Sequence, residues 1–159
     1  MQVIEERYAT ASGIQVERRA TELPLATAID PLVEALDSQR GMLLASTYDY
    51  PGRYKRWDMG FVNPPLVIEA RQRRFRIAAL NERGERLIPE LQATLAKLAA
   101  VESLERHGGD LQGTIGEPTG RFAEEERSKQ PSVFSVLRAL VQSFFHPAER
   151  YLGLYGSFG

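Results

Sequence analysis

Residues 66–80 read LVIEARQRRFRIAAL, and this stretch decides the kind of fold that the chain can adopt. Leu66–Ala70 and Phe75–Leu80 are short, mainly apolar runs, and the polar run Arg71-Gln72-Arg73-Arg74 separates them. Runs rich in branched and aromatic residues on either side of a polar turn are typical of two strands joined in a hairpin. The stretch therefore predicts a β-hairpin and, with it, antiparallel pairing.

Further strands are predicted on both sides of this hairpin. Residues 14–21 alternate imperfectly between apolar and polar side chains, as in a strand with one wet face. Met42–Thr47 is apolar enough for a buried strand, and Arg53–Phe61 can be extended. Asn81-Glu82-Arg83-Gly84 is predicted to form another turn, and Tyr151–Gly159 is typical of a glycine-containing strand.

Three helices are predicted from apolar side chains at helical spacing. Asp30 is expected to cap the first, with Pro31 at its first helical position. Its expected buried face consists of Ile29, Leu32, Val33 and Leu36. The second is expected over Pro89–Ala99, with Leu91, Leu95 and Leu98 on one face. The third is expected over Ser132–Phe145, with one buried stripe made of Phe134, Leu137, Leu140, Val141, Phe144 and Phe145.

Residues 107–130, which are rich in glycine, glutamate and polar groups, are predicted to form a long exposed loop. Antiparallel hairpins with separate helices indicate an α+β fold. We expect a mainly antiparallel, twisted sheet of about five to seven strands with about three flanking helices.

Composition limits the possible functions. The chain has 159 residues, a formal net charge of −1 and no cysteine, so it suits one region with its own core and offers neither disulfides nor thiolate chemistry. No apolar run approaches the roughly 20 residues that span a bilayer, and the N-terminus lacks the pattern of a secretory signal. These features favour a cytoplasmic protein that does not bind membranes or nucleic acid.

The sequence contains few residues or motifs that indicate a catalytic site. No dinucleotide-binding or phosphate-loop motif is present. His107 precedes two glycines and is expected in a loop, whereas His146 is expected at the end of a helix. Glu124-Glu125-Glu126 could offer carboxylates to Mg²⁺, but three consecutive acids do not share a helix face, so a solvated charge run is favoured. No catalytic residue and no metal ligand is assigned.

Residues 42–65, MLLASTYDYPGRYKRWDMGFVNPP, are the most informative stretch for function. Their aromatic and basic side chains allow three interpretations: a surface for single-stranded nucleic acid, a strand pair with aromatic cross-strand contacts, or a pocket for a small ligand. The neutral overall charge disfavours the first interpretation.

The same stretch carries a family resemblance. Leu43-Leu44-Ala45-Ser46 resembles the LLES motif of anthranilate synthase large subunits. Residues 52–58, GRYKRWD, and Asn63-Pro64-Pro65 are similar to the stretch that follows in that family. The sequence YPGRYKRWD at residues 50–58 most resembles the fused type of the family, in which one chain carries synthase and glutamine amidotransferase parts. Tyr151–Gly159 is similar to the family's glycine-rich strand. The resemblance thus identifies residues 1–159 as an N-terminal region, whose sheet is expected to form half of a two-sheet sandwich in the full-length enzyme.

The resemblance implies a role in making anthranilate from chorismate, with ammonia from glutamine and a Mg²⁺ ion, as the first step of tryptophan biosynthesis. The family's chorismate and Mg²⁺ residues lie in a C-terminal part, so this region alone is expected to be inactive and to bind no Mg²⁺. Its expected partners are that C-terminal part, a glutamine amidotransferase domain or subunit and L-tryptophan as feedback inhibitor. Without its C-terminal part, the chain is expected to expose an apolar patch, through which it could form a homo-oligomer.

The tryptophan site is implied residue by residue. Ser46 matches the serine of LLES that contacts the inhibitor, and Arg56 matches a basic residue of the next strand. Ala45 stands where the family has a glutamate, so the carboxylate partner of the ligand's ammonium group is missing there. A hydroxyl and a guanidinium on neighbouring strands can hold one carboxylate. Alternatively, Ser46 caps a turn and Arg56 is a solvated strand residue.

Two other functions stay open. A related chorismate-using enzyme, such as aminodeoxychorismate or aminodeoxyisochorismate synthase, would share the N-terminal pattern. A stand-alone amino-acid-binding or interaction module would have no catalytic partner.

Overall fold

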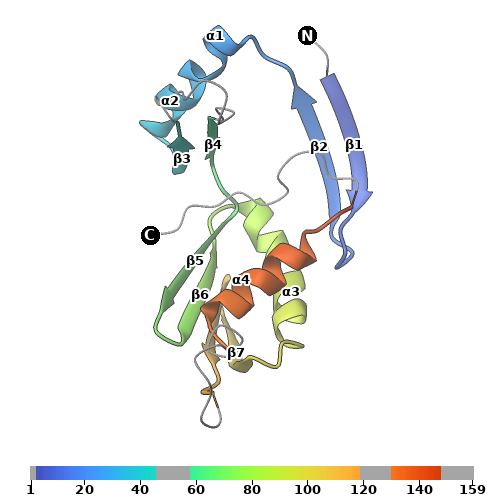
Figure 1. Ribbon diagram of the computed structural model, residues 1–159, viewed down its shortest axis with the longest axis vertical. Coiled ribbons are helices and arrows are strands. Elements are labelled where there is room, and N and C mark those ends of the chain that lie inside the picture. Colours follow the sequence, from blue (N-terminus) through green and yellow to red (C-terminus); the bar gives the residue numbers. More distant parts are fainter. Residues whose placement is uncertain (1–2, 46–57, 119–129, 148–159) are drawn as a thin grey trace, which may run out of the picture. The chain divides into compact units, whose positions relative to one another are not determined.

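The computed structural model describes residues 3–45, 58–118 and 130–147 (Figure 1). The described residues divide into two compact units, one formed by residues 3–6, 17–45 and 58–64 and the other by residues 7–16, 65–118 and 130–147.

The larger unit is built on a four-stranded antiparallel sheet with the strand order β5-β6-β8-β7. β5 (Leu66–Arg71) and β6 (Arg74–Ala79) pair from Leu66↔Ala79 to Arg71↔Arg74, which confirms the predicted hairpin. Gln72 in its turn has a φ of 57°, in the left-handed region.

One face of this sheet is covered by helices α3 (Glu82–Leu95) and α4 (Val133–Ser143) (Figure 1). Alternation along β6 turns Phe75 and Ile77 into the core and leaves Arg74 and Arg76 exposed. The core consists of Phe75, Ile77, Ile88, Leu91, Leu95, Leu111, Ile115, Val136 and Leu140. Full burial of each large aliphatic side chain contributes about 1.5–3 kcal/mol to stability.

Helix α3 begins earlier than the sequence predicts. Residues 82–84 do not form a separate tight turn; they are the first residues of helix α3. The Asn81 side chain caps this helix by accepting a hydrogen bond from the Gly84 N–H at 3.2 Å. Pro89 lies inside the helix, not at its start. Proline inside a helix removes one backbone hydrogen bond. The burial of Ile88, Leu91 and Leu95 stabilises α3 in spite of that loss.

The predicted loop at residues 107–130 is wrong for its first part. β7 (Val101–His107) and β8 (Asp110–Ile115) form a hairpin, with His107 as the last residue of β7. Gly108 turns the chain with a φ of 61°. Gly108 and Gly109, two of the glycines that suggested a loop, are therefore turn residues between two strands.

Helix α4 confirms the third predicted helix, but its buried face differs from the predicted stripe. Val136, Leu140 and Ser143 are the buried residues, whereas Phe134, Val141 and Phe145 are 71%, 51% and 59% exposed. The Ser135 hydroxyl accepts a hydrogen bond from the Ser132 N–H at 3.2 Å, which satisfies one donor at the helix start.

The end of α4 is joined to a hairpin that the sequence only half predicted. β1 (Val3–Ala9) was not expected, whereas β2 (Gln15–Thr21) confirms the strand at residues 14–21. In the turn between them, Ala11 N–H donates to the Phe145 carbonyl at 2.8 Å, and the Ser12 hydroxyl donates to the Ser143 carbonyl at 2.8 Å. The His146 ring lies 4.6 Å from the Tyr8 ring, between centroids. The carbonyls of Ser143 and Phe145, at and just after the end of α4, thus accept hydrogen bonds from the turn of this hairpin.

The smaller unit contains α1 (Leu25–Ala28), α2 (Asp30–Leu36), β3 (Gly41–Leu44) and β4 (Met59–Val62). Asp30 is the first residue of α2 and not its cap, which is Ile29. Of the predicted apolar face, Ile29, Leu32 and Leu36 are half-buried, but Val33 is 46% exposed.

The described residues confirm the α+β class with antiparallel sheets and flanking helices. Their eight strands are divided among three sheets of two, two and four strands. The predicted strand at residues 151–159 lies outside the described residues.

Candidate functional site

The predicted ligand site begins with the β3–β4 hairpin, which α2 covers at close range. Gly41 pairs with Val62, and Gly60 pairs with Leu43, so the two glycines share one face. A Cβ on Gly41 would collide with the Phe61 carbonyl oxygen and the Leu36 side chain, and one on Gly60 with the Met42 carbonyl oxygen and the Leu32 side chain. Because the carbonyl oxygens belong to the paired strands themselves, both positions favour glycine, and α2 lies close to the same face.

Ala45 is placed directly after β3, and its side chain is exposed. Ser46 and Arg56, the other two predicted site residues, lie outside the described residues. Their roles therefore stay predictions. β3 confirms the strand expected from Met42, and β4 confirms extended chain from Met59.

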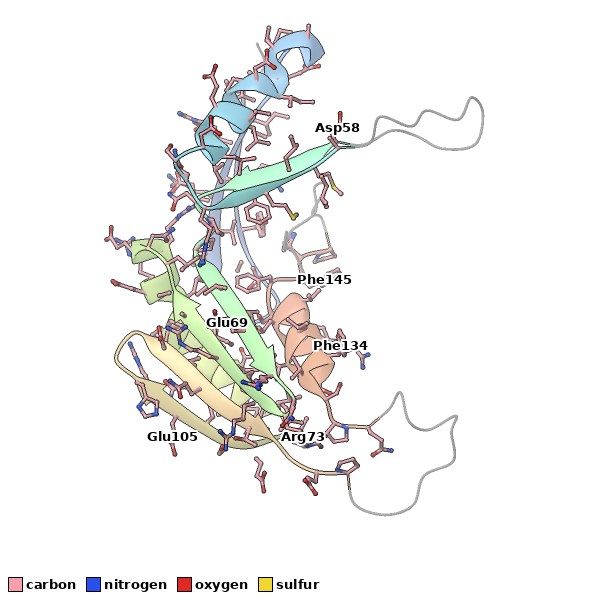
Figure 2. All side chains as sticks on the ribbon, turned by 90° about the vertical axis from the view of Figure 1, so that its left-hand side faces the viewer. Asp58, Glu69, Arg73, Glu105, Phe134 and Phe145 are labelled. Carbon is pink, nitrogen blue, oxygen red and sulfur yellow. The ribbon has the colours of Figure 1, made fainter. Side chains whose placement is uncertain are left out.

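The hairpin brings a carboxylate toward Ala45 that the sequence alone did not single out. The strand pairing ends at Leu44↔Met59, and Ala45 and Asp58 are the residues that directly flank this last pair. Asp58 is half-buried and lies where β4 begins, as Figure 2 shows. Because the register fixes this neighbour, spacing along the sequence could not have found it.

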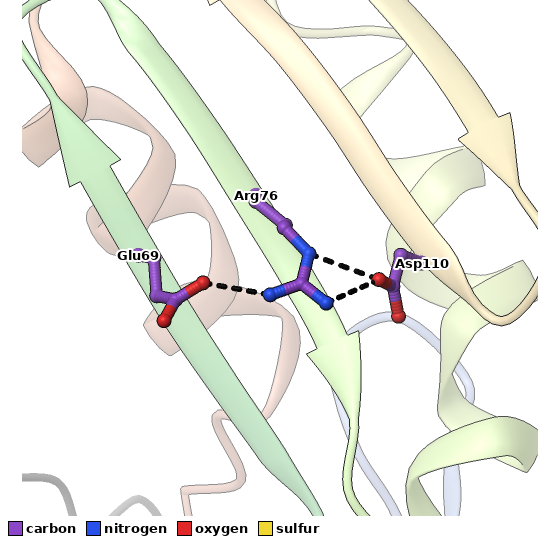
Figure 3. Close-up of polar contacts among 3 residues, drawn as sticks. All are labelled: Glu69, Arg76 and Asp110. Carbon is purple, nitrogen blue, oxygen red and sulfur yellow. Dashed lines mark hydrogen bonds and ion pairs between the residues drawn. The ribbon is translucent and has the colours of Figure 1, made fainter.

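The open face of the four-stranded sheet carries a row of charges across β5, β6 and β8 (Figure 3). Arg76 Nη1 donates to Glu69 Oε2 at 2.7 Å, and Arg76 Nη2 donates to Asp110 Oδ2 at 2.6 Å. Hydrogen bonds to Glu69 and then to Asp110 raise the pKa of Arg76. The guanidinium is exposed, so this triad is an ordered surface network and not a buried acid–base pair.

Arg73, in the β5–β6 turn, points instead toward backbone carbonyls. Its Nε donates to the Ile115 carbonyl at 3.2 Å, and its Nη2 donates to the carbonyls of Gly116 and Pro131. One side chain thus fixes both the end of β8 and the residue before the cap of α4.

A shallow cavity of about 250 Å³ lies beside α4. Leu98, Ala100 and Ala139 supply apolar lining, and Arg138 and Gln142 supply polar groups. Pockets for small molecules usually enclose about 300–1,000 Å³. The cavity is thus small for such a ligand.

Across residues 3–45, 58–118 and 130–147, no three His, Asp or Glu side chains are grouped so as to hold a metal ion. Glu124, Glu125 and Glu126 lie outside these ranges. No helix in the same ranges is long and apolar enough to cross a membrane.

The described part of the chain therefore defines an α+β protein built on antiparallel sheets. Over 152 residues the chain is 45% identical to anthranilate synthase from Azospirillum brasilense, and the match covers 96% of this chain. The predicted resemblance to anthranilate synthases is thus confirmed over nearly the whole chain. The chain spans 21% of the length of that relative. No protein-family model matches the chain, and no solved structure matches it significantly.

Proposed function

We propose that this chain is the N-terminal regulatory and scaffold region of an anthranilate synthase. The observation that carries the proposal is the 45% identity to an anthranilate synthase over 96% of the chain. In the longer protein, a C-terminal part binds chorismate and Mg²⁺, and a glutamine amidotransferase part supplies ammonia. The region described here supplies a folded support and part of a tryptophan site.

The tryptophan site that we propose lies at the end of the β3–β4 hairpin where residues 45–58 connect the two strands. Ser46 and Arg56 bind the carboxylate of the amino acid, since a hydroxyl and a forked guanidinium both donate to it. Asp58 takes the place of the glutamate that Ala45 lacks, and its carboxylate accepts hydrogen bonds from the ammonium group. The positions of Ala45 and Asp58, which flank the last strand pair Leu44↔Met59, support this assignment.

Calorimetric titration of the chain with L-tryptophan tests the proposal. We expect saturable heat and a loss of affinity of about tenfold or more in Ser46→Ala, which removes a hydrogen bond to a charged group. A similar loss is expected in Asp58→Asn, which removes the charge that pairs with the ammonium group. Ser103→Ala, an exposed change on β7, is the matched control and should bind as the unchanged chain does. No heat at millimolar tryptophan would exclude a tryptophan site in this chain. Unchanged affinity in Ser46→Ala would move the site elsewhere.

Ala45→Glu restores the carboxylate that the family carries at this position. The side chain of Ala45 is exposed, so the longer residue fits without repacking the hairpin. We predict that tryptophan affinity rises about tenfold, the effect of one added charge-assisted hydrogen bond. Ala45→Gln has nearly the same shape without the charge and should give a smaller gain. Equal affinity in both variants would show that no ammonium group lies beside residue 45.

The reaction of the longer protein needs its own test. The complete polypeptide, assayed with chorismate, Mg²⁺ and either glutamine or ammonia, should form anthranilate, whereas residues 1–159 alone should not. Formation of an aminodeoxychorismate product instead would assign the chain to a related chorismate-using enzyme.

A further inference from the structure

The open face of the four-stranded sheet holds a second group of arginines beside the Arg76 network. Arg71 and Arg74 are the last pair of the β5–β6 hairpin and lie directly opposite each other. Arg71 is two residues from Glu69, and Arg74 is two residues from Arg76, so all four share the open face. Arg71 and Arg74 are exposed.

Like charges directly opposite each other destabilise a strand pair. The neighbouring pair on this face, Glu69↔Arg76, is complementary, and Asp110 adds a second carboxylate to Arg76. Within residues 3–45, 58–118 and 130–147, by contrast, no carboxylate pairs with Arg71 or Arg74. Among the described residues, the sheet thus gives one arginine two carboxylate partners and leaves two adjacent arginines facing solvent.

Hydroxyl groups continue the same row across the sheet. Thr114 lies opposite Arg74, and Ser103 lies opposite Thr114 on the next strand. Thr114 is half-buried, and its neighbours Gly113 and Ile115 are buried on the core face, so its side chain belongs to the open face. Two guanidinium forks beside a hydroxyl provide donors on two sides of one oxyanion.

We propose that Arg71, Arg74 and the Thr114 hydroxyl form a binding site for a phosphate-type dianion. A dianion removes the repulsion between the two arginines, which a single carboxylate does only in part. The planar guanidinium groups match the oxygen spacing of a tetrahedral phosphate. This inference does not rest on the proposed function, since it uses only the sheet register, exposure and charge.

The chain has one further source of clustered oxygens, the run Glu124-Glu125-Glu126, which lies outside the described residues. The test therefore uses two backgrounds, the unchanged chain and a variant in which these three glutamates are replaced by glutamine. Inorganic phosphate is titrated into each at low, constant ionic strength, and backbone amide NMR shifts are followed at residues 71, 74 and 114. Chloride at the same ionic strength is the control anion.

We expect a saturable shift in at least one background and a loss of phosphate affinity of about tenfold or more in the double variant Arg71→Gln/Arg74→Gln. The double variant Arg19→Gln/Arg86→Gln changes the net charge equally at two arginines that pair with Glu5 and Glu82, and it should keep the site. Binding only in the glutamine background would show that the glutamates compete for the same arginines, which supports the site. Linear shifts in both backgrounds, or equal weakening in both double variants, would overturn it.

Discussion

The Arg73 side chain joins the end of β8 to the residue before the cap of α4 through backbone carbonyls. Its guanidinium reaches the carbonyls of Ile115, Gly116 and Pro131. We predict that Arg73→Ala lowers the free energy of unfolding by about 2 kcal/mol, since hydrogen bonds to charged groups contribute about 1.5–3 kcal/mol. Urea unfolding followed by circular dichroism measures the change.

Arg73→Lys should recover less than half of that loss, because an ammonium group cannot donate in the same fork. Arg86→Ala is the control, as its exposed pair with Glu82 on α3 should contribute about 0.5 kcal/mol or less. A loss no larger than that control in Arg73→Ala would show that the carbonyls are satisfied without the guanidinium.

At the residue scale, the chemical type of a candidate site residue was easier to predict from the sequence than the residues that lie near it in the fold. The motif around Ala45 could be found in the sequence because its residues are consecutive. The carboxylate of Asp58 could not be assigned, since it lies thirteen positions away and only the pairing Leu44↔Met59 places both residues at the same end of the two strands. The Arg76 network is a similar case, because Glu69 and Asp110 reach it from two different strands.

At the scale of single elements, the start of α3 tests how the chain chooses between a turn and a helix. The Asn81 side chain accepts a hydrogen bond from the Gly84 N–H. Asn81→Ala should lower the free energy of unfolding by about 1 kcal/mol, the usual effect of losing such a cap. Asn81→Asp keeps the acceptor and should stay within about 0.5 kcal/mol of the unchanged chain. Equal losses in both variants, in thermal or urea unfolding, would assign Asn81 a role other than capping.

The errors at this scale have physical causes. Residues 81–84 contain asparagine and glycine, which favour turns and helix caps alike, and only the burial of Ile88 and Leu91 selects the helix. Residues 107–116 were expected in a loop because glycines outnumber apolar residues there. Leu111 and Ile115 nevertheless alternate into the core as strand residues do. The hairpin at residues 66–80 was predicted correctly because the apolar runs of its strands and the polar residues of its turn both indicate a hairpin.

At the scale of the whole molecule, the choice of face on α4 decides how much apolar surface meets solvent. Both sides of this helix are apolar, so periodicity predicts a helix without fixing which side is buried. Leu140 is buried, whereas Phe134 and Phe145, labelled in Figure 2, are exposed.

We predict that Phe134→Ser/Phe145→Ser changes the free energy of unfolding by about 1 kcal/mol or less, because neither ring fills the core. Leu140→Ala should cost about 2–5 kcal/mol, as expected for a cavity in a packed core. The serine pair should also lower binding of a hydrophobic dye and any self-association seen in sedimentation. A loss in the serine pair that equals the loss in Leu140→Ala would mean that the helix buries the other side.

The position of Arg73 also matters to protein engineering. Its guanidinium donates hydrogen bonds to the carbonyls of both Gly116 and Pro131. These hydrogen bonds fix the two ends of the stretch between them, whatever residues that stretch contains. Closing a longer loop between fixed ends costs only about 0.6 kcal/mol for each doubling of its length. An affinity tag or a small reporter domain spliced between these two residues should therefore leave the sheet and α4 intact.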